Sequence, residues 1–230
     1  MRANLLRSIS HDLRTPLTSI SGNASVLINN SGSLDENKKM QLYEVIYDDS
    51  LWLINLVENL LSVTRIEDGK MNLHLETELI EEVINEALNH ISHKKDEHRI
   101  EVKANDEFIL AKIDAGLIIQ VIINIVDNAI KYTPKGSMIS IETFKHKDFV
   151  EIQIADDGAG ISDKDKEKLF EMFYTRNNLN GDSRRGLGLG LALCKSIVEA
   201  HDGKIKVIDN YPRGSIFVIN LPLEEVDIHG

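Results

Sequence analysis

The hydrophobic pattern changes its period near residues 67–72, and this change constrains the fold more than any other feature. Before it, apolar residues recur every three or four positions over 5–28 and again over 34–66, which predicts two long amphipathic helices. After it, short alternating segments are mixed with helical ones, which is typical of a sheet with one helical layer. The sequence thus predicts an all-α hairpin, residues 1–68, followed by an α+β two-layer sandwich, residues 69–230.

Two details of the predicted hairpin have structural consequences. Its apolar stripe is too wide for two helices to cover, so we expect a second copy to complete a dimeric four-helix bundle. Pro16 lies inside the first helical pattern, where it removes a backbone donor and predicts a kink. Ser33, with Glu36 three residues on, is the expected cap of the second helix, and Gly69 is expected to end it.

The second region combines several short elements. We expect helices at 78–95, 115–133, 163–173 and 191–201, and strands at 71–76, 99–105, 108–114, 204–209 and 215–222, with a hairpin over 136–156.

Composition excludes some classes of protein. A net charge of −11 argues against nucleic acid as the main partner, because phosphate backbones need clustered Lys and Arg. The single Cys194 excludes an intramolecular disulfide framework and fits a reducing compartment. The richest apolar run, "LIIQVIINIV", is far shorter than a membrane span. The start, "MRANLLRSIS", lacks the apolar core of a signal peptide and begins within a helical pattern, which indicates a piece of a longer protein.

Four polar residues share one side of the helix predicted at 115–133. Asn124 and Asn128 are four apart, and Lys131 and Tyr132 follow one turn later. Amide oxygens suit Mg²⁺, a lysine suits phosphate, and an aromatic ring can stack on a base. Alternatively, the two asparagines are hydrogen-bonded polar residues of the core.

Two glycine-rich segments could approach a ligand closely. Asp156, Gly158 and Gly160 follow a predicted strand directly, which fits either a binding loop or an ordinary turn. Gly186, Gly188 and Gly190 lead into a helix, whose first amides can bind phosphate. The spacing matches neither a P-loop nor a Rossmann fingerprint. The polar loop between these segments, residues 175–185, carries Arg176, Arg184 and Arg185, which suits a lid over a charged ligand or a solvated loop.

The segment "SISHDLRTPLT" places His11, Asp12, Thr15 and Pro16 within six positions near the start of the chain. Alone, it could be a reactive site or a polar stretch with a chance histidine.

Taken together and in this order, the segments resemble the catalytic core of bacterial sensor histidine kinases. "SISHDLRTPLTSISG" resembles the H box, "NIVDNAIKYTP" the N box, "DDGAGI" the G1 box, "LFEMFY" the F box and "GLGLGLALCKSIVEAHDG" the G2 box. "RGSIFVINLPL" resembles the final strand, so the resemblance covers essentially the whole chain. Within the family, the first segment is most similar to the KdpD-type potassium sensor kinases.

The resemblance implies a phosphotransfer domain followed by an ATP-binding domain of the Hsp90, gyrase and MutL type. His11 would be the phosphoacceptor, Asp12 would orient its ring, and Thr15 would position water for dephosphorylation of the partner. That partner would be the receiver domain of a response regulator, which accepts the phosphate on an aspartate. The protein would be a homodimer that does not bind nucleic acid. It would be the cytoplasmic portion of a membrane-anchored protein, attached only through a sensor region N-terminal to this chain.

The resemblance also implies ATP and Mg²⁺. Asn128 would be the Mg²⁺ ligand with Asn124 beside it, Lys131 would contact phosphate, Tyr132 would stack near adenine, and Asp156 would accept from the adenine amine. The glycines Gly158, Gly160, Gly186, Gly188 and Gly190 would shape the nucleotide pocket and lid hinge, and Arg176 would belong to the lid. Phe170 and Phe173 would pack at the base of the lid.

Three positions depart from the family pattern. Leu187 stands where the G2 box usually has Thr or Ser, Asp202 replaces a glycine, and "PRGS" has one glycine where two are common. None removes a residue with an assigned chemical role, so we expect an active enzyme.

Other classes of function stay open. An ATPase of the same fold without phosphotransfer and a dimeric scaffold with a degenerate nucleotide site are the alternatives. The histidines His90, His93 and His98 lie in a charged segment that we expect to be exposed, and the absence of a cysteine among them argues against a zinc site. Cys194 is expected to be a core residue.

Overall fold

A computed structural model describes residues 2–30, 32–67, 73–91, 98–104, 108–175 and 188–223. Side chains of 2–12, 55, 58–67 and 104 lie outside the described part. The chain divides into two compact units, the first containing Met1–Glu67 and the second containing Asp68–Gly181 and Gly188–Gly230.

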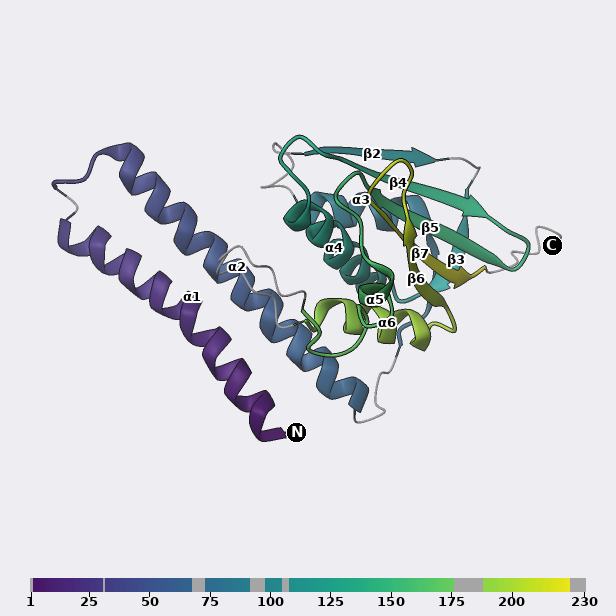
Figure 1. Ribbon diagram of the computed structural model, residues 1–230, viewed down its shortest axis with the longest axis horizontal. Helices are drawn as coiled ribbons and strands as arrows, with labels where there is room; N and C mark the ends of the chain where they lie inside the picture. Colours follow the sequence, from purple (N-terminus) through teal and green to yellow (C-terminus); the bar gives the residue numbers. More distant parts are fainter. Residues whose placement is uncertain are drawn as a thin grey trace. The chain divides into compact units, whose positions relative to one another are not determined.

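The first unit is an antiparallel helical hairpin of α1 (Arg2–Asn30) and α2 (Glu36–Glu67), which lie side by side in Figure 1. Helix α1 continues unbroken through Pro16, so the kink predicted there does not interrupt it. Asp35, rather than Ser33, caps α2, since its carboxylate accepts from the Lys38 amide at 2.7 Å. The Ser33 hydroxyl instead donates to the carbonyl of Asn30 at the end of α1. Gly69, the predicted end of α2, lies outside the described residues.

The second unit is a mixed five-stranded sheet with helices on one face (Figure 1). The strand order is β2 (Arg99–Ala104), β4 (Met138–Lys145), β5 (Phe149–Asp156), β7 (Ser215–Pro222) and β6 (Lys204–Asp209). Only the β2–β4 pair of this sheet is parallel. A separate two-stranded sheet pairs β1 (Glu76–Leu79) with β3 (Leu110–Ile113). The predicted two-layer sandwich is confirmed.

The helical layer consists of α3 (Ile80–His90), α4 (Ala115–Tyr132) and α6 (Gly190–Ala200). Side chains alternate between buried and half-buried along β5, which is the pattern of a strand with one face against a core. The core is rich in isoleucines that are at most 1% exposed: Ile80, Ile84, Ile113, Ile118, Ile122, Ile125, Ile139, Ile141, Ile152, Ile154 and Ile197.

Helix α4 is also long and apolar enough to cross a membrane by length and composition, the one such helix among the described residues. Its apolar face is buried in this structure, from Ile118 to Ile130. A helix in the core of a protein can have the same length and apolar composition. The composition of α4 therefore follows from its packing against the sheet.

Two short elements differ from the predictions. The first strand lies at 76–79 instead of 71–76, and α5 (Asp163–Lys166) spans four residues where a helix over 163–173 was expected. After α5, the amide of Phe173 donates to the carbonyl of Gly188 at 3.0 Å, and Phe173 has a φ of 66°. This contact with a distant segment takes the backbone out of helical geometry.

Candidate nucleotide site

Helix α4 holds the four polar residues that the sequence singled out. It begins at Asp114, whose side chain accepts from the Leu117 amide at 3.2 Å and so caps the helix. The apolar face packs into the core, while Asn124 and Asn128 are half-buried one turn apart. Both asparagines are therefore partly accessible at the edge of the core. A side chain that binds Mg²⁺ through its amide oxygen has to be accessible in this way.

The end of α4 presents a cation and an aromatic ring. The Lys131 ammonium lies 5.2 Å from the centroid of the Tyr132 ring, and that tyrosine is 54% exposed. The helix ends at Thr133, whose amide and hydroxyl both donate to the carbonyl of Ala129. Both Lys131 and Tyr132 are thus exposed, next to the polar edge of the helix.

Asp156 is a buried carboxylate at the end of β5. One of its oxygens accepts from the Gly158 amide at 2.8 Å, and the Ser215 amide also donates to this carboxylate. Burial raises the pKa of Asp156 above its ordinary value, and the two amide donors partly offset this effect. A buried carboxylate with an available acceptor suits a ligand that offers an N–H group.

Gly158 is required by close packing between Asp156 and the end of α4. A Cβ built at this position would lie 2.8 Å from a carboxylate oxygen of Asp156 and 2.8 Å from the Cγ2 of Thr133. Both distances are shorter than real Cβ contacts. The turn after β5 therefore packs directly on the residue that follows Tyr132.

The second glycine-rich segment meets α4 at Asn124. Gly188 has a φ of 66°, and a Cβ there would lie 2.4 Å from the carbonyl oxygen of Tyr174. Gly190 begins α6, and a Cβ there would lie 3.2 Å from the Oδ1 of Asn124. The first amides of a helix have no partner within the helix and are suited to phosphate, and α6 begins next to Asn124.

Helix α4 links these residues, since Gly158 packs on Thr133 and Gly190 on Asn124, and the set of donors that they offer fits a nucleotide with Mg²⁺. Glycines leave space where side chains would stand, Asn124 and Asn128 offer hard oxygen ligands, and Lys131 offers charge to phosphate. Gly160, with a φ of 78°, lies in the turn after Asp156. Arg176 and Gly186, together with Arg184, Arg185 and Leu187, lie outside the described residues.

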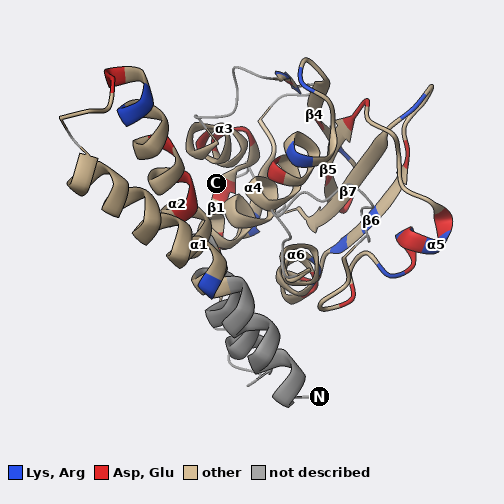
Figure 2. Cartoon of the chain, turned by 60° about the vertical axis from the view of Figure 1, so that its left-hand side comes forward, with Lys and Arg blue, Asp and Glu red and all other residues tan. Residues whose placement is uncertain are grey.

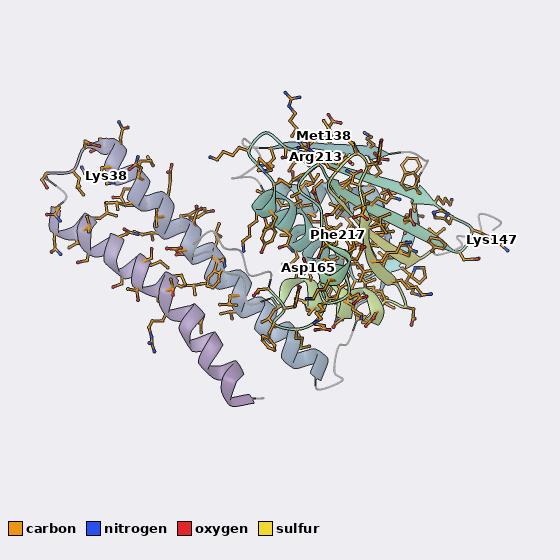
Figure 3. The ribbon with its side chains drawn as sticks, in the orientation of Figure 1. Lys38, Met138, Lys147, Asp165, Arg213 and Phe217 are labelled. Carbon is orange, nitrogen blue, oxygen red and sulfur yellow. The ribbon has the colours of Figure 1, made fainter. Side chains whose placement is uncertain are left out.

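The two phenylalanines near the loop differ in their surroundings. Phe170 packs edge-to-face on Phe217 of β7, with ring centroids 6.5 Å apart, whereas Phe173 is 42% exposed. Figure 3 shows Phe217 within the body of the second unit.

In the helical hairpin, His11 and Asp12 belong to α1, but their side chains lie outside the described part. One turn after His11, Thr15 is exposed, and Pro16 is buried. The part of α1 after Asp12 carries few charged residues, as the mostly tan helix in Figure 2 shows.

Two further predictions concern residues away from the site. Cys194 is fully buried, and burial raises its pKa to about 12, so it is the expected core residue. His98, in contrast, is buried rather than exposed. Its Nε2 is hydrogen-bonded to the hydroxyl of Thr133 at 2.9 Å. His93 lies outside the described residues. Within the described part, no group of three His, Cys, Asp or Glu residues could hold a metal ion.

Sequence reasoning missed three residues around Asp156: Ser215, Asn210 and Thr133. Ser215 lies next to Asp156 only because β7 pairs with β5, and Asn210 reaches Asp156 from the turn before β7. In the sequence, Asn210 and Ser215 flank residues 211–214, whose proline and glycine are typical of a turn.

Two family models match the chain. Residues 1–69 match the His Kinase A (phospho-acceptor) domain, and residues 113–225 match the histidine kinase-, DNA gyrase B-, and HSP90-like ATPase. The chain is 47% identical over 224 residues to the sensor protein KdpD of Clostridium acetobutylicum, and 32% identical over 222 residues to KdpD of Escherichia coli. These alignments cover 97% and 96% of this chain but only 25% and 24% of the two relatives, so the chain spans about a quarter of their length.

Solved structures of similar proteins share the fold. The Acinetobacter baumannii histidine kinase AdeS aligns with a TM-score of 0.68 at 26% identity, covering 93% of this chain and 98% of that one. The histidine kinase ThkA, solved in complex with the response regulator protein TrrA, aligns with a TM-score of 0.66 at 25% identity, covering 96% of this chain and 61% of that one.

Proposed function

The chain belongs to the histidine kinases, and on that premise we propose that it is the catalytic core of a bacterial two-component sensor kinase. It would phosphorylate itself on His11 with ATP and pass the phosphate to an aspartate of a response regulator. The observation that carries this proposal is the packing of both glycine-rich segments on the N-box helix α4, with Gly158 against Thr133 and Gly190 against Asn124.

The two regions would divide the work. Residues 1–68 would form the dimerisation and phosphotransfer domain, and residues 69–230 the ATP-binding domain. Exposed apolar side chains along the helical hairpin, such as Met40, Tyr43 and Ile54, support pairing with a second copy into a four-helix bundle.

In the second unit, the described site residues would each have a role in nucleotide binding. Asp156 would accept from the adenine amine, and Tyr132 would stack near the base. Lys131 would contact phosphate, while Gly158, Gly160, Gly188 and Gly190 would keep the pocket open. From the parts outside the described residues, Arg176 and Gly186 would complete the phosphate end.

Asn128 would hold Mg²⁺, with Asn124 beside it. When bound, the ion would neutralise charge on the phosphates, which matters because phosphoryl transfer depends on positioning and charge more than on covalent help. Two observations support this role: Asn128 is half-buried, and it belongs to a helix whose N-terminus is capped by Asp114.

His11 would be the nucleophile. An unperturbed histidine has a pKa of about 6.5, so a large fraction of its imidazole is neutral near pH 7. Asp12 would orient the ring and raise its basicity by accepting from one nitrogen, which leaves the other nitrogen free to attack the γ-phosphorus. The bond from that phosphorus to the bridging oxygen breaks, and ADP leaves.

Thr15 would position water when the response regulator is dephosphorylated. It is exposed one turn from His11, where a partner could reach it. The structure of ThkA with TrrA supports a receiver domain as the partner. Similarity to KdpD supports a membrane-anchored parent protein, of which this chain would be a cytoplasmic portion, with the sensor region on its N-terminal side.

Labelled ATP tests this function against an ATPase or a scaffold. The full chain is incubated with γ-labelled ATP and Mg²⁺, and the protein-bound label is then exposed to acid or to alkali. We expect label that is lost in acid and kept in alkali, because phosphohistidine is acid-labile. Nucleotide hydrolysis without protein-bound label would mean an ATPase, and neither would mean a scaffold.

A further inference from the structure

On the β7 side of β5, the backbone carbonyl of Asp156 accepts a hydrogen bond from a side chain outside the sheet, while on the other side Asp156 pairs with Ile139 of β4. The antiparallel ladder between β5 and β7 ends at the pair Ala155 and Ile216, one residue before Asp156. Asp156 is buried, and a buried carbonyl without a donor costs free energy. The turn that joins β6 to β7 closes over this position.

Asn210, the first residue of that turn, provides this donor. Its side-chain amide donates to the Asp156 carbonyl at 2.8 Å, while its own backbone amide donates to the carbonyl of Gly214 at 3.1 Å. Asn210 is therefore bonded to the turn through its main chain and to the end of β5 through its side chain. It takes the place of a strand partner beyond the last ladder pair.

Packing around the same turn shows how closely it fits. Gly214 has a φ of 109°, and a Cβ there would lie 1.9 Å from the Asp156 carbonyl oxygen. A Cβ at Gly160 would lie 3.3 Å from the Gly214 carbonyl oxygen. The turn thus contacts both the start and the end of the segment from Asp156 to Gly160.

Figure 3 agrees with this placement. Arg213 of the turn and Met138 at the start of β4 lie toward the same end of the sheet, away from Lys147 in the β4–β5 turn. The Met138 amide donates to the side chain of Asp157, next to Asp156. The strand end is thus fixed from β4 on one side and from the β6–β7 turn on the other.

We infer that Asn210 is a positioning residue that sets how well the Asp156 carboxylate recognises the exocyclic amine of adenine. The inference rests on the proposed ATP site. Asn210 fixes the main chain of Asp156, and the Gly158 and Ser215 amides fix its carboxylate. Without the Asn210 bond the carboxylate shifts relative to the base, and the amine contact weakens while phosphate contacts on α4 and α6 stay.

The test compares two nucleotides on the full chain. ATP and purine riboside 5′-triphosphate differ only in the 6-amino group, and their dissociation constants are measured by calorimetry with Mg²⁺. For Asn210→Ala we expect ATP to bind roughly three- to tenfold more weakly, the effect of one hydrogen bond. The dissociation constant of the analogue, which makes no amine contact, should change by less than about twofold. Asn210→Asp keeps the size of the side chain but loses the donor. It should therefore reduce the preference for ATP over the analogue at least as much as Asn210→Ala does.

A matched control is Tyr211→Ala, since this side chain is in the same turn and 94% exposed; both affinities should stay as in the wild type. Equal losses for the two nucleotides, or an unchanged preference in either Asn210 variant, would overturn the inference alone. A wild type that binds ATP no better than the analogue would instead overturn the proposed role of Asp156, and one that binds neither would overturn the proposed function.

Discussion

The two units differ in where their apolar side chains lie. In the described part of the hairpin, Pro16 and Leu56 are the only buried apolar residues, whereas Ile28, Met40, Tyr43 and Ile54 are all more than half exposed. In the second unit, the helices and the sheet enclose a core that excludes water. The second unit therefore buries its apolar side chains by itself, whereas the hairpin requires a partner surface to bury its own.

Charge follows the same division. Over residues 13–30, α1 has a single charged residue, Arg14, and Figure 2 shows this helix almost entirely in tan. On the second unit, both signs of charge are spread over exposed elements such as α5. The uncharged, apolar helix face is suited to a bundle interface.

The largest expected effect concerns the association of two copies through the apolar side chains of α2. Ile54→Glu places a charge in the exposed apolar stripe of α2, once in each copy. Because each buried isoleucine contributes about 1.5–3 kcal/mol, we expect the dimer dissociation constant to rise roughly a hundredfold or more. Sedimentation equilibrium of the full chain measures it.

The matched control for that change is Ile208→Glu. Ile208 is 39% exposed on the edge strand β6 of the second unit. The dissociation constant should stay as in the wild type. If the two variants dissociate the dimer equally, or if neither does, the contrast between the units fails.

A smaller effect concerns the second unit, where the carboxylate of Asp156 is buried at the end of β5. Asp156→Asn keeps the size and the acceptor for the Gly158 amide but removes the charge. Because burial raises the pKa of Asp156 in the folded protein, the wild type loses stability as pH rises through that pKa. We therefore expect the variant to have the larger free energy of unfolding at pH 7, with the advantage disappearing in acid.

Urea denaturation at several pH values measures this difference. Asp157→Asn is the control, since its side chain can still accept from the Met138 amide, and its stability should differ little from the wild type. A variant Asp156→Asn that is less stable than the wild type at pH 7 would show that the buried charge supports the fold instead of serving a ligand.

Long periodic elements and motifs could be predicted from sequence. The helices α1, α2, α4 and α6 and the strands β6 and β7 lie within a few residues of their predicted bounds, because each buries one continuous face. The resemblance of the motifs added the family, which the family models confirm. The individual roles of the site residues stay predictions.

The shorter features depend on tertiary contacts that local patterns do not contain. The strand at Glu76–Leu79 has little alternation and forms because it pairs with β3. The segment after α5 reads as helical, yet Phe173 bonds to Gly188. Asn210 reaches Asp156 across 54 residues, so nothing near either residue in the sequence indicates the contact.

The central claim is that one unit supplies the phosphate and the other receives it. It is tested most directly by measuring ATP binding and acid-labile labelling side by side for His11→Ala and Asn128→Ala. The account predicts that His11→Ala binds ATP as the wild type does but takes no label, while Asn128→Ala loses both. Acid-labile label on His11→Ala, or unchanged ATP binding by Asn128→Ala, would contradict it.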